Sequence, residues 1–268
     1  MPLPFSISIV ACNEEINIAR CLASAADLAE EIVVVDSGSR DRTREVAEAY
    51  GARVVHHDWI GYRDQKNIAL NLCTKEWVLA LDCDEELSPE LRTEIQRFFA
   101  DGKDRKFDGA SFNRKVWFMG RWITHGDWYP DTKLRLFRRQ KARWGGSPEH
   151  DYIELDGKSI WLGGDLHHFS FPSINRYIEK INVFADVFLE RQKSAGKSWS
   201  LATNVFRPWW RFFRAYFIRR GFMDGFPGLW IAVATAFSAF IRYSRKYEDE
   251  ANARVHSPYL NHKSDNLL

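Results

Sequence analysis

Four short apolar runs, each followed by a helix-forming stretch, constrain the fold of this chain more than any other feature. The apolar runs cover residues 5–11, 31–36, 53–56 and 77–81. Three helix-like stretches separate these runs. The first ends near residue 28, the second covers residues 41–50 and the third covers residues 62–73. Strands that alternate with helices of this length form parallel sheets with right-handed crossovers. The sequence therefore predicts an α/β fold with a mostly parallel sheet.

Polar side chains follow three of the four predicted strands. Asn13 follows the first strand, Asp36 ends the second and Asp82 follows the fourth. Ligands of such sheets bind outside the carboxyl ends of the strands. We therefore expect these three side chains to converge on one crevice.

Asp82 and Asp84 are separated by one residue at the end of the fourth strand. This spacing suits Mg²⁺ or Mn²⁺, because such ions are commonly held by one or two carboxylates together with substrate phosphates. The ion then neutralises charge on a leaving diphosphate. The alternative is that residues 82–86 form a turn whose carboxylates cap the next helix and face solvent. Their position after a parallel strand favours the metal site.

Composition excludes several other classes of protein. A net charge of +2 argues against a general nucleic-acid binder. The four cysteines form no CxxC pair, so we expect neither disulfides nor a structural zinc site, which fits a reducing cytoplasm. The first residues lack the basic and apolar segments of an export signal.

The middle of the chain is predicted to be α+β. Ser88 and Pro89 are suited to the start of a helix over residues 88–99. Residues 109–119 and 132–138 then alternate as strands do.

Four segments in order resemble the signatures of glycosyltransferase family 2. They are SIVACNEE at 8–15, IVVVDSGSRD at 32–41, QKNIA at 65–69 and WVLALDCDE at 77–85. The resemblance covers about residues 5–170 and is closest to the lipopolysaccharide-core glucosyltransferase group. It implies a GT-A-type, mostly parallel sheet flanked by helices, an inverting displacement and a nucleoside-diphosphate-sugar donor.

The resemblance also implies roles for individual residues. Asp36 would accept a hydrogen bond from a uracil ring N–H, although as an alternative it caps a turn. Lys66 would face the diphosphate, although an isolated helical lysine is usually solvated. The remaining implied contacts are Ala11 with the base, Asn13 and Glu14 with the nucleotide or sugar, Asp82 with the ribose and Asp84 with the metal.

An inverting transfer needs a base that takes the proton of the acceptor hydroxyl. The family group commonly carries His-Glu where this chain has His150-Asp151, which makes Asp151 the predicted base and leaves the adjacent Glu149 as the alternative. The resemblance implies His168 as a further metal ligand, with a satisfied structural histidine as the alternative. Because neighbouring strand residues point to opposite faces, at most one of His167 and His168 reaches the metal.

Residues 140–144 read Q-x-x-R-W, a pattern that marks processive polysaccharide synthases of the same family. The match precedes the predicted base instead of following it, and the chain lacks several transmembrane helices. We therefore interpret it as chance and expect transfer of a single sugar.

The last quarter of the chain is rich in aromatic and basic residues. Residues 204–217 interleave seven aromatic rings with arginines, which suits an amphipathic helix at an anionic membrane surface. Residues 225–241 are uncharged, but Pro227 and Gly228 are predicted to break their start, leaving about 14 helical residues where a span needs about 20. The alternatives are that both helices cover the catalytic domain or form an oligomer; nucleic-acid binding is disfavoured.

These features predict a catalytic domain over residues 1–172, a helical extension over 173–258 and a frayed tail over 259–268. The expected activity is transfer of one sugar from a UDP-sugar, UDP-glucose above all, to a lipid-linked or lipopolysaccharide-core acceptor, with Mg²⁺ or Mn²⁺, at the cytoplasmic face of the inner membrane. The alternatives are a degenerate, membrane-associated nucleotide-binding domain and a nucleotidyltransferase. The second alternative lacks its usual Gly-rich, basic phosphate loop after the first strand.

Overall fold

The computed structural model describes residues 1–147, 150–171 and 173–254. The chain forms two compact units. Unit 1 contains residues 1–124 and 128–170, and unit 2 contains residues 125–127 together with the chain from 171 onward. The predicted tail over 259–268 lies outside the described residues. The predicted domain border at 172 also falls on an undescribed residue and stays a prediction.

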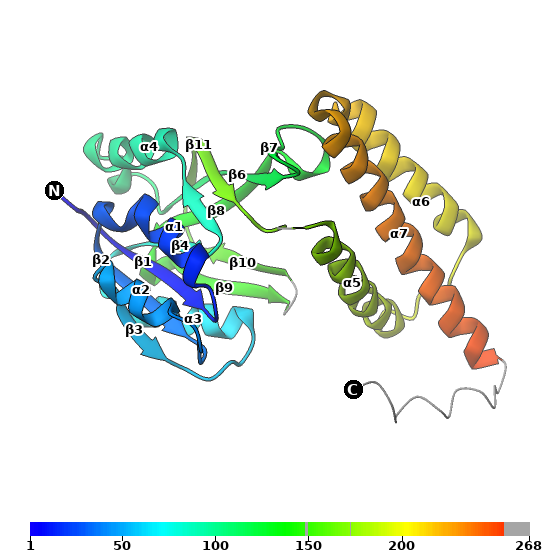
Figure 1. Ribbon diagram of the computed structural model, residues 1–268, viewed down its shortest axis with the longest axis horizontal. Helices are drawn as coiled ribbons and strands as arrows, with labels where there is room; N and C mark the ends of the chain where they lie inside the picture. Colours follow the sequence, from blue (N-terminus) through cyan, green and yellow to red (C-terminus); the bar gives the residue numbers. More distant parts are fainter. Residues whose placement is uncertain (148–149, 172, 255–268) are drawn as a thin grey trace. The chain divides into compact units, whose positions relative to one another are not determined.

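Unit 1 is built on a mixed sheet whose nine strands, within the described residues, have the order β3-β2-β1-β4-β8-β6-β11-β5, with β7 paired to β6. Strands β3, β2, β1 and β4 are mutually parallel, whereas β8 runs antiparallel to both β4 and β6 (Figure 1). The bounds are β1 Leu3–Ala11, β2 Ala29–Asp36, β3 Arg53–His56, β4 Trp77–Asp82, β5 Glu85–Leu87, β6 Gly109–Phe118, β7 Arg121–Trp122, β8 Asp131–Arg138 and β11 Ser159–His168.

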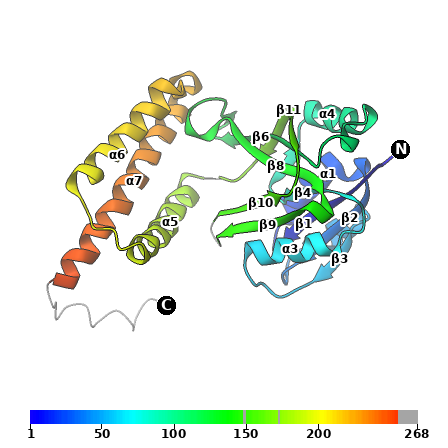
Figure 2. The same cartoon turned by 180° about the vertical axis from the view of Figure 1, so that it is seen from behind.

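Both faces of the sheet are covered, as Figures 1 and 2 show from opposite sides. One face carries α1 (Glu15–Ala25), α2 (Thr43–Ala49) and α4 (Pro89–Ala100). The other carries α3 (Tyr62–Leu72) and the hairpin of β9 (Ala142–Ser147) and β10 (His150–Leu155). Short 3₁₀ helices cover Ala26–Leu28, Lys103–Arg105, Gly126–Trp128 and Arg139–Lys141.

Alternation along the strands explains the two covers. Val34 packs into the core beneath α1 and α4, whereas its neighbour Val33 packs with Leu70 of α3 and Trp144 of β9. Successive strand side chains point to opposite faces, so a run such as that of β2 must be apolar throughout when both faces are buried. This pattern is the one from which the parallel sheet was predicted.

Strand register brings the predicted polar ends together. Ala11 of β1 lies opposite Asp36 of β2, and Val10 lies opposite Asp82 of β4. At the other side of the sheet, His168 of β11 lies opposite Glu85 of β5. The carboxyl ends of β1, β2, β4 and β11 and the amino end of β5 therefore lie at one edge of the sheet.

The start of α4 is fixed by its predicted cap. The Ser88 hydroxyl accepts the backbone N–H of Leu91 at 3.1 Å, and Pro89 occupies the first turn. Gly164 of β11 has φ +82°, and a Cβ there would lie 2.4 Å from the Leu91 nitrogen, so only glycine lets the strand approach this helix. The helix predicted from residue 88 is confirmed.

Unit 2 is helical. Its elements are α5 Ile174–Ser194, α6 Leu201–Phe213, a π-helical turn η5 at Arg214–Ile218, a 3₁₀ turn η6 at Gly221–Asp224 and α7 Gly225–Arg254. Asp127 is bound by Arg214 at 2.9 Å and Arg219 at 3.4 Å, and the backbone N–H of His125 donates to Asp224 at 2.8 Å. These contacts explain why residues 125–127 belong to unit 2.

The predicted break near Pro227 is wrong. α7 is continuous from Gly225 for 30 residues, because proline is tolerated in the first turn of a helix, where its missing N–H has no intrahelical partner. The segment Gly221–Ala253 is long and apolar enough to cross a membrane by length and composition, but half of its apolar window is buried inside the protein. That criterion alone is weak, since core helices also satisfy it.

Candidate active site

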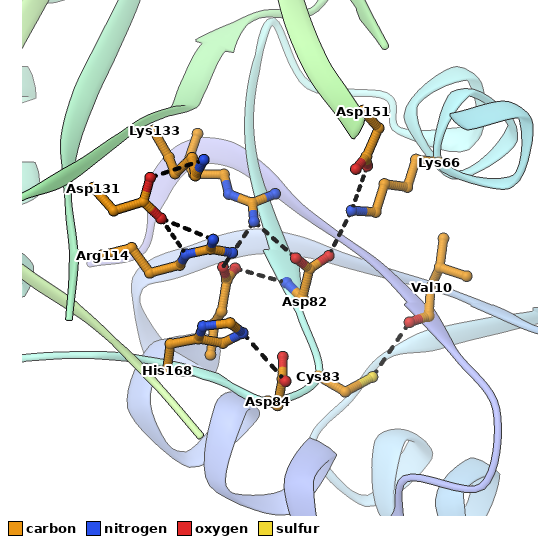
Figure 3. A network of polar contacts seen from close by, with 12 residues as sticks. Val10, Lys66, Asp82, Cys83, Asp84, Arg114, Asp131, Lys133, Asp151 and His168 are labelled. Atoms are coloured by element: carbon orange, nitrogen blue, oxygen red, sulfur yellow. Dashed lines mark hydrogen bonds and ion pairs between the residues drawn. The ribbon is translucent and has the colours of Figure 1, made fainter. Parts of the chain in front are cut away.

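Asp82, at the end of β4, lies between two cations. Its Oδ1 is 2.7 Å from the Lys66 ammonium of α3 (Figure 3). Its Oδ2 accepts a hydrogen bond from the Arg135 guanidinium of β8 at 2.8 Å. Burial raises the pKa of Asp82, but Arg135 and then Lys66 lower it more, so the pKa stays well below its usual range. The carboxylate is therefore ionised at neutral pH.

Glu85 fixes the turn that carries the two aspartates. It has no exposed surface, and its carboxylate accepts the backbone N–H of Asp82 at 2.9 Å and the Arg135 guanidinium at 2.7 Å. Arg114 of β6 lies 3.5 Å from the same carboxylate. A buried carboxylate with these partners holds the Asp82–Asp84 turn rigid, because moving the turn would leave a buried charge unpaired.

Arg114 extends this network toward β8. It pairs with Asp131 at 2.8 Å, and Lys133 pairs with the same carboxylate at 2.9 Å (Figure 3). Burial raises the pKa of Asp131, but Arg114 and Lys133 lower it below its usual value. The result is a continuous layer of alternating charges beside the DxD turn.

Asp84 pairs with His168, as the resemblance implies. The Asp84 Oδ2 and His168 Nε2 atoms are 3.3 Å apart (Figure 3). The backbone N–H of Phe169 donates to the Asp84 carbonyl at 2.9 Å. Burial raises the pKa of Asp84, but the contact with His168 lowers it more, leaving the pKa below its usual value. The structure thus brings together two residues that are 84 positions apart in the sequence.

The Asp84–His168 pair fits a divalent cation. Two donor atoms bound side by side at about 2.1 Å in an octahedral ion lie about 3 Å apart, close to the observed separation. Among the described residues no group of three His, Cys, Asp or Glu side chains could hold a metal. An ion held here would therefore complete its coordination with phosphate oxygens and water, as Mg²⁺ commonly does.

Asp151 of β10 reaches the same centre. Its Oδ2 lies 2.7 Å from the Lys66 ammonium, which therefore bridges Asp82 and Asp151 (Figure 3). The Trp144 ring packs against that ammonium at 4.4 Å and against the Arg135 guanidinium at 5.6 Å. The predicted base and the DxD turn are thus joined by one buried cation.

The loops after β1 and β2 are linked to one another. The carboxylate of Asp36 accepts the backbone N–H groups of Gly38 and Ser39 at 3.0 and 3.1 Å and has no exposed surface. Asn13, in the left-handed region at φ +56°, accepts the backbone N–H of Arg40 at 2.8 Å, and its own backbone N–H donates to the Ser39 hydroxyl. Asp36 therefore caps its own turn, the alternative stated above, and its contact with a base stays a prediction.

Two further predicted residues line this edge. Ala11 is buried and its carbonyl accepts the backbone N–H of Ser37 at 2.9 Å. Glu14 accepts a hydrogen bond from Asn17 at 2.6 Å, and its pKa is raised by burial and by the nearby charge of Asp84. Glu14 therefore lies near the Asp84 end of the site, while Ala11 lies near Asp36.

The two neighbouring histidines differ as the alternation predicts. His168 faces Asp84, whereas the His167 ring stacks on Trp122 at 4.1 Å and lies 3.8 Å from Glu86. Burial lowers the pKa of His167. Only His168 is in contact with the DxD turn.

The structure decides between the alternatives for one predicted site residue and adds residues that the sequence interpretation missed. Lys66 is only 9% exposed, so the solvated-lysine alternative is wrong. Arg135 was not predicted, because an arginine between Leu134 and Leu136 in an alternating strand indicates the solvent-facing side, whereas here that side is covered and Arg135 is 4% exposed. Trp144, set aside with the Q-x-x-R-W match, contacts two site cations. Glu149 lies outside the described residues, so the choice between it and Asp151 stays open.

Comparison with known proteins identifies the family of the chain. The family model described as Glycosyl transferase family 2 matches residues 6–154, which include the DxD turn and Asp151. The chain belongs to glycosyl transferase family 2. Family 2 members transfer sugars, so the protein is a transferase, and the sequence resemblance is confirmed.

Individual relatives of this glycosyltransferase extend the likeness over the whole chain. It is 30% identical to the lipopolysaccharide core biosynthesis glycosyltransferase LpsC of Rhizobium meliloti over 93% of this chain and 94% of that protein. It is 31% identical to an uncharacterized glycosyltransferase of Rickettsia typhi over 97% of this chain and 93% of that protein. Residues 1–349 of S. aureus TarS, crystallised with UDP-GlcNAc, match with a TM-score of 0.50 at 15% identity, over 94% of this chain and 92% of that one. The predicted GT-A-type α/β fold is confirmed.

Proposed function

We propose that this family 2 enzyme is an inverting hexosyltransferase that moves one sugar, glucose above all, from a UDP-sugar to a lipid-linked or lipopolysaccharide-core acceptor. The observation that carries the proposal is the Lys66 bridge, with 2.7 Å from its ammonium to both Asp82 and Asp151. It puts a candidate base beside the candidate donor site. LpsC, similar over nearly the full chain, is named for lipopolysaccharide core biosynthesis, and this supports the acceptor class.

The residues of this chain suit a single displacement. Asp151 takes the proton of the acceptor hydroxyl while the oxygen of that hydroxyl forms a bond to the sugar C1. The bond from C1 to the diphosphate breaks at the same time, and UDP leaves with the electron pair. Lys66 and Arg135 provide buried positive charge next to Asp82, which favours binding of the diphosphate. The proposed proton acceptor therefore lies in direct contact with Lys66, one of the two cations beside the proposed diphosphate position.

Asp84 and His168 are the residues that would hold Mg²⁺ or Mn²⁺, since their donor atoms are spaced for one ion. When bound, the ion supplies Lewis-acid stabilisation of the leaving diphosphate. We assign ribose contact to Asp82 and nucleotide contacts to Ala11, Asn13, Glu14 and Asp36. The acceptor class and the basic, aromatic unit 2 together favour work at the cytoplasmic face of the inner membrane.

The test uses purified full-length protein, UDP-glucose, Mn²⁺ and a truncated lipopolysaccharide acceptor. Asp84→Asn should abolish the metal-dependent part of UDP binding measured by calorimetry. Asp151→Asn should bind UDP as the wild type does but release UDP from the donor about 10²- to 10⁴-fold more slowly. Asp58→Asn, at an aspartate whose side chain is 95% exposed, is the matched control and should change neither measurement.

Each alternative predicts a different result. If Asp151→Asn turns over normally, this residue is not the base. If the wild type binds UDP tightly but transfers no sugar from a panel of UDP-sugars, the chain is the degenerate binding protein. If Mn²⁺-dependent binding persists in Asp84→Asn, the metal assignment is wrong.

A further inference from the structure

The packing of unit 2 is inverted relative to that of unit 1. All of the largest fully buried side chains of the described chain, such as Trp77, Phe98 and Phe137, belong to unit 1. The residues buried in α6, η5, η6 and α7 are mostly small or polar. They are Asn204, Ala215, Gly221, Asp224, Gly228, Ile231, Ala232, Ala234, Thr235, Ser238, Ala239 and Lys246.

Many of the large apolar side chains of these elements are exposed instead. Trp209 is 59% exposed and Phe237 is 51% exposed. The exposed set, which we call the outer apolar face, is Leu201, Val205, Phe206, Trp209, Trp210, Phe213, Phe217, Ile218, Phe222, Met223, Phe226, Val233, Phe237 and Phe240. A face of this extent is unusual for a water-soluble surface.

Glycines allow the backbones inside unit 2 to approach closely. A Cβ on Gly228 would lie 1.9 Å from the carbonyl oxygen of Gly221, and a Cβ on Gly221 would lie 2.7 Å from that of Ala215. Helices that pack through small residues and expose large apolar residues are typical of membrane proteins. In a bilayer, burying apolar side chains between helices offers no advantage over their contact with hydrocarbon.

Basic residues outnumber acidic ones beside the outer apolar face. Residues 201–247 contain eight basic residues and a single acidic residue, Asp224, which is buried. Arg214 and Arg219 pair with Asp127, and Arg245 pairs with Asp186. Among the described residues no carboxylate lies within ion-pair distance of Arg207, Arg211 or Arg220. Positive charge next to exposed Trp and Phe rings matches a phosphate-bearing surface over hydrocarbon.

We infer that the outer apolar face embeds in one leaflet of an anionic lipid bilayer, with acyl chains covering its rings and its arginines at the lipid phosphates. The uncharged part of α7, residues 225–241, is about 25 Å long at 1.5 Å per residue, short of the roughly 30 Å hydrocarbon core. Arg207 and Arg211 keep α6 at the headgroups. The unit is therefore monotopic: it lies in one leaflet and does not span the bilayer.

This inference does not rest on the catalytic assignments, so its failure and theirs are distinguishable. Asp84→Asn must bind membranes as the wild type does. Two alternatives to lipid, namely that a second copy of the chain or unit 1 covers the outer apolar face, are distinguished by the test below.

The first measurement is flotation of full-length protein with vesicles of phosphatidylcholine, with and without about a quarter of phosphatidylglycerol. The protein should float with the anionic vesicles and stay bound in about 0.5 M NaCl, because acyl contact is not screened by salt. Trp209→Glu should lower the partition coefficient at least about tenfold. Trp161→Glu, at an unit 1 tryptophan that is 57% exposed, is the matched control and should float as the wild type does.

The second measurement uses conservative variants that keep the fold. Lipids brominated on their acyl chains should quench tryptophan fluorescence, and Trp209→Phe should remove part of this quenching while Trp161→Phe should not. Three results would overturn the inference. The protein stays in solution as a monomer or dimer, it is released completely from the vesicles by salt, or the quenching is the same in both variants.

Discussion

Replacing Arg135 with methionine tests the charge network that holds the DxD turn. The guanidinium is 4% exposed and donates to Asp82 and to the fully buried Glu85. Methionine fills a similar volume but leaves the more distant Arg114, at 3.5 Å, as the only cation beside Glu85 among the described residues. Removing one partner of a buried ion pair costs about 3–5 kcal/mol, so we expect a loss of this size in the free energy of unfolding.

Equilibrium urea denaturation measures this loss. Lys133→Met, on the same strand with a side chain that is 39% exposed, is the control and should change stability by less than about 1 kcal/mol. The double variant Arg135→Met with Glu85→Leu should recover part of the loss, because it removes the stranded carboxylate as well. A single-variant effect below about 1 kcal/mol would refute the view that this guanidinium holds the turn.

The same variant has a pH signature. The pKa of Asp82 is lowered in the folded protein, so its stabilisation is present above the unfolded pKa of about 3.9 and is lost as pH falls toward the folded value. Without Arg135 the folded pKa rises toward the unfolded one. The difference between wild type and Arg135→Met should therefore be full at neutral pH and shrink below about pH 4.

Two further substitutions test packing. The side chain of Asn67 exchanges two hydrogen bonds with the backbone of Trp144, at 2.9 and 3.0 Å. Asn67→Ala should therefore lower the free energy of unfolding by about 1–3 kcal/mol and speed hydrogen exchange of the Trp144 amide. Unchanged exchange would contradict this. Gly228→Ala should destabilise unit 2 by about 1–3 kcal/mol, because its Cβ would overlap the Gly221 carbonyl. Gly163→Ala is the control and should cost clearly less, because its Cβ would make only an ordinary contact at 3.7 Å. Equal shifts in melting temperature would count against close backbone packing.

The parallel half of the sheet was predictable from the sequence because its signals are local. An apolar run that ends in a carboxylate, as at Asp36 and Asp82, indicates a buried strand and its functional end within one segment. The cap at Ser88 is equally local. The pairing of Asp84 with His168 was also anticipated, but through the family resemblance and not through any pattern in the residues themselves.

The rest of the site depends on contacts between distant segments. Arg135 reaches Asp82 only because β8 inserts antiparallel next to β4, a pairing that no short pattern encodes. The resemblance implied a site role for Lys66, but its contacts with Trp144 and two carboxylates come from segments far away in the sequence. Pro227 misled because its effect depends on its position in the helix, and that position is set by where α7 begins.

The allocation of residues 125–127 to unit 2 bears on how the protein is made and how it can be divided. The chain enters unit 2 for three residues, returns to complete β8 and β11 of unit 1, and leaves again after residue 170. A ribosome therefore releases Asp127 long before its partners Arg214 and Arg219 exist, so this short segment must wait for the last third of the chain. Unit 2 can therefore not be separated at a single point in the chain. A protein ending at residue 170 would keep Asp127, whose side chain is 9% exposed in the intact protein, without its arginine partners. The C-terminal helices transferred to another enzyme would lack Asp127.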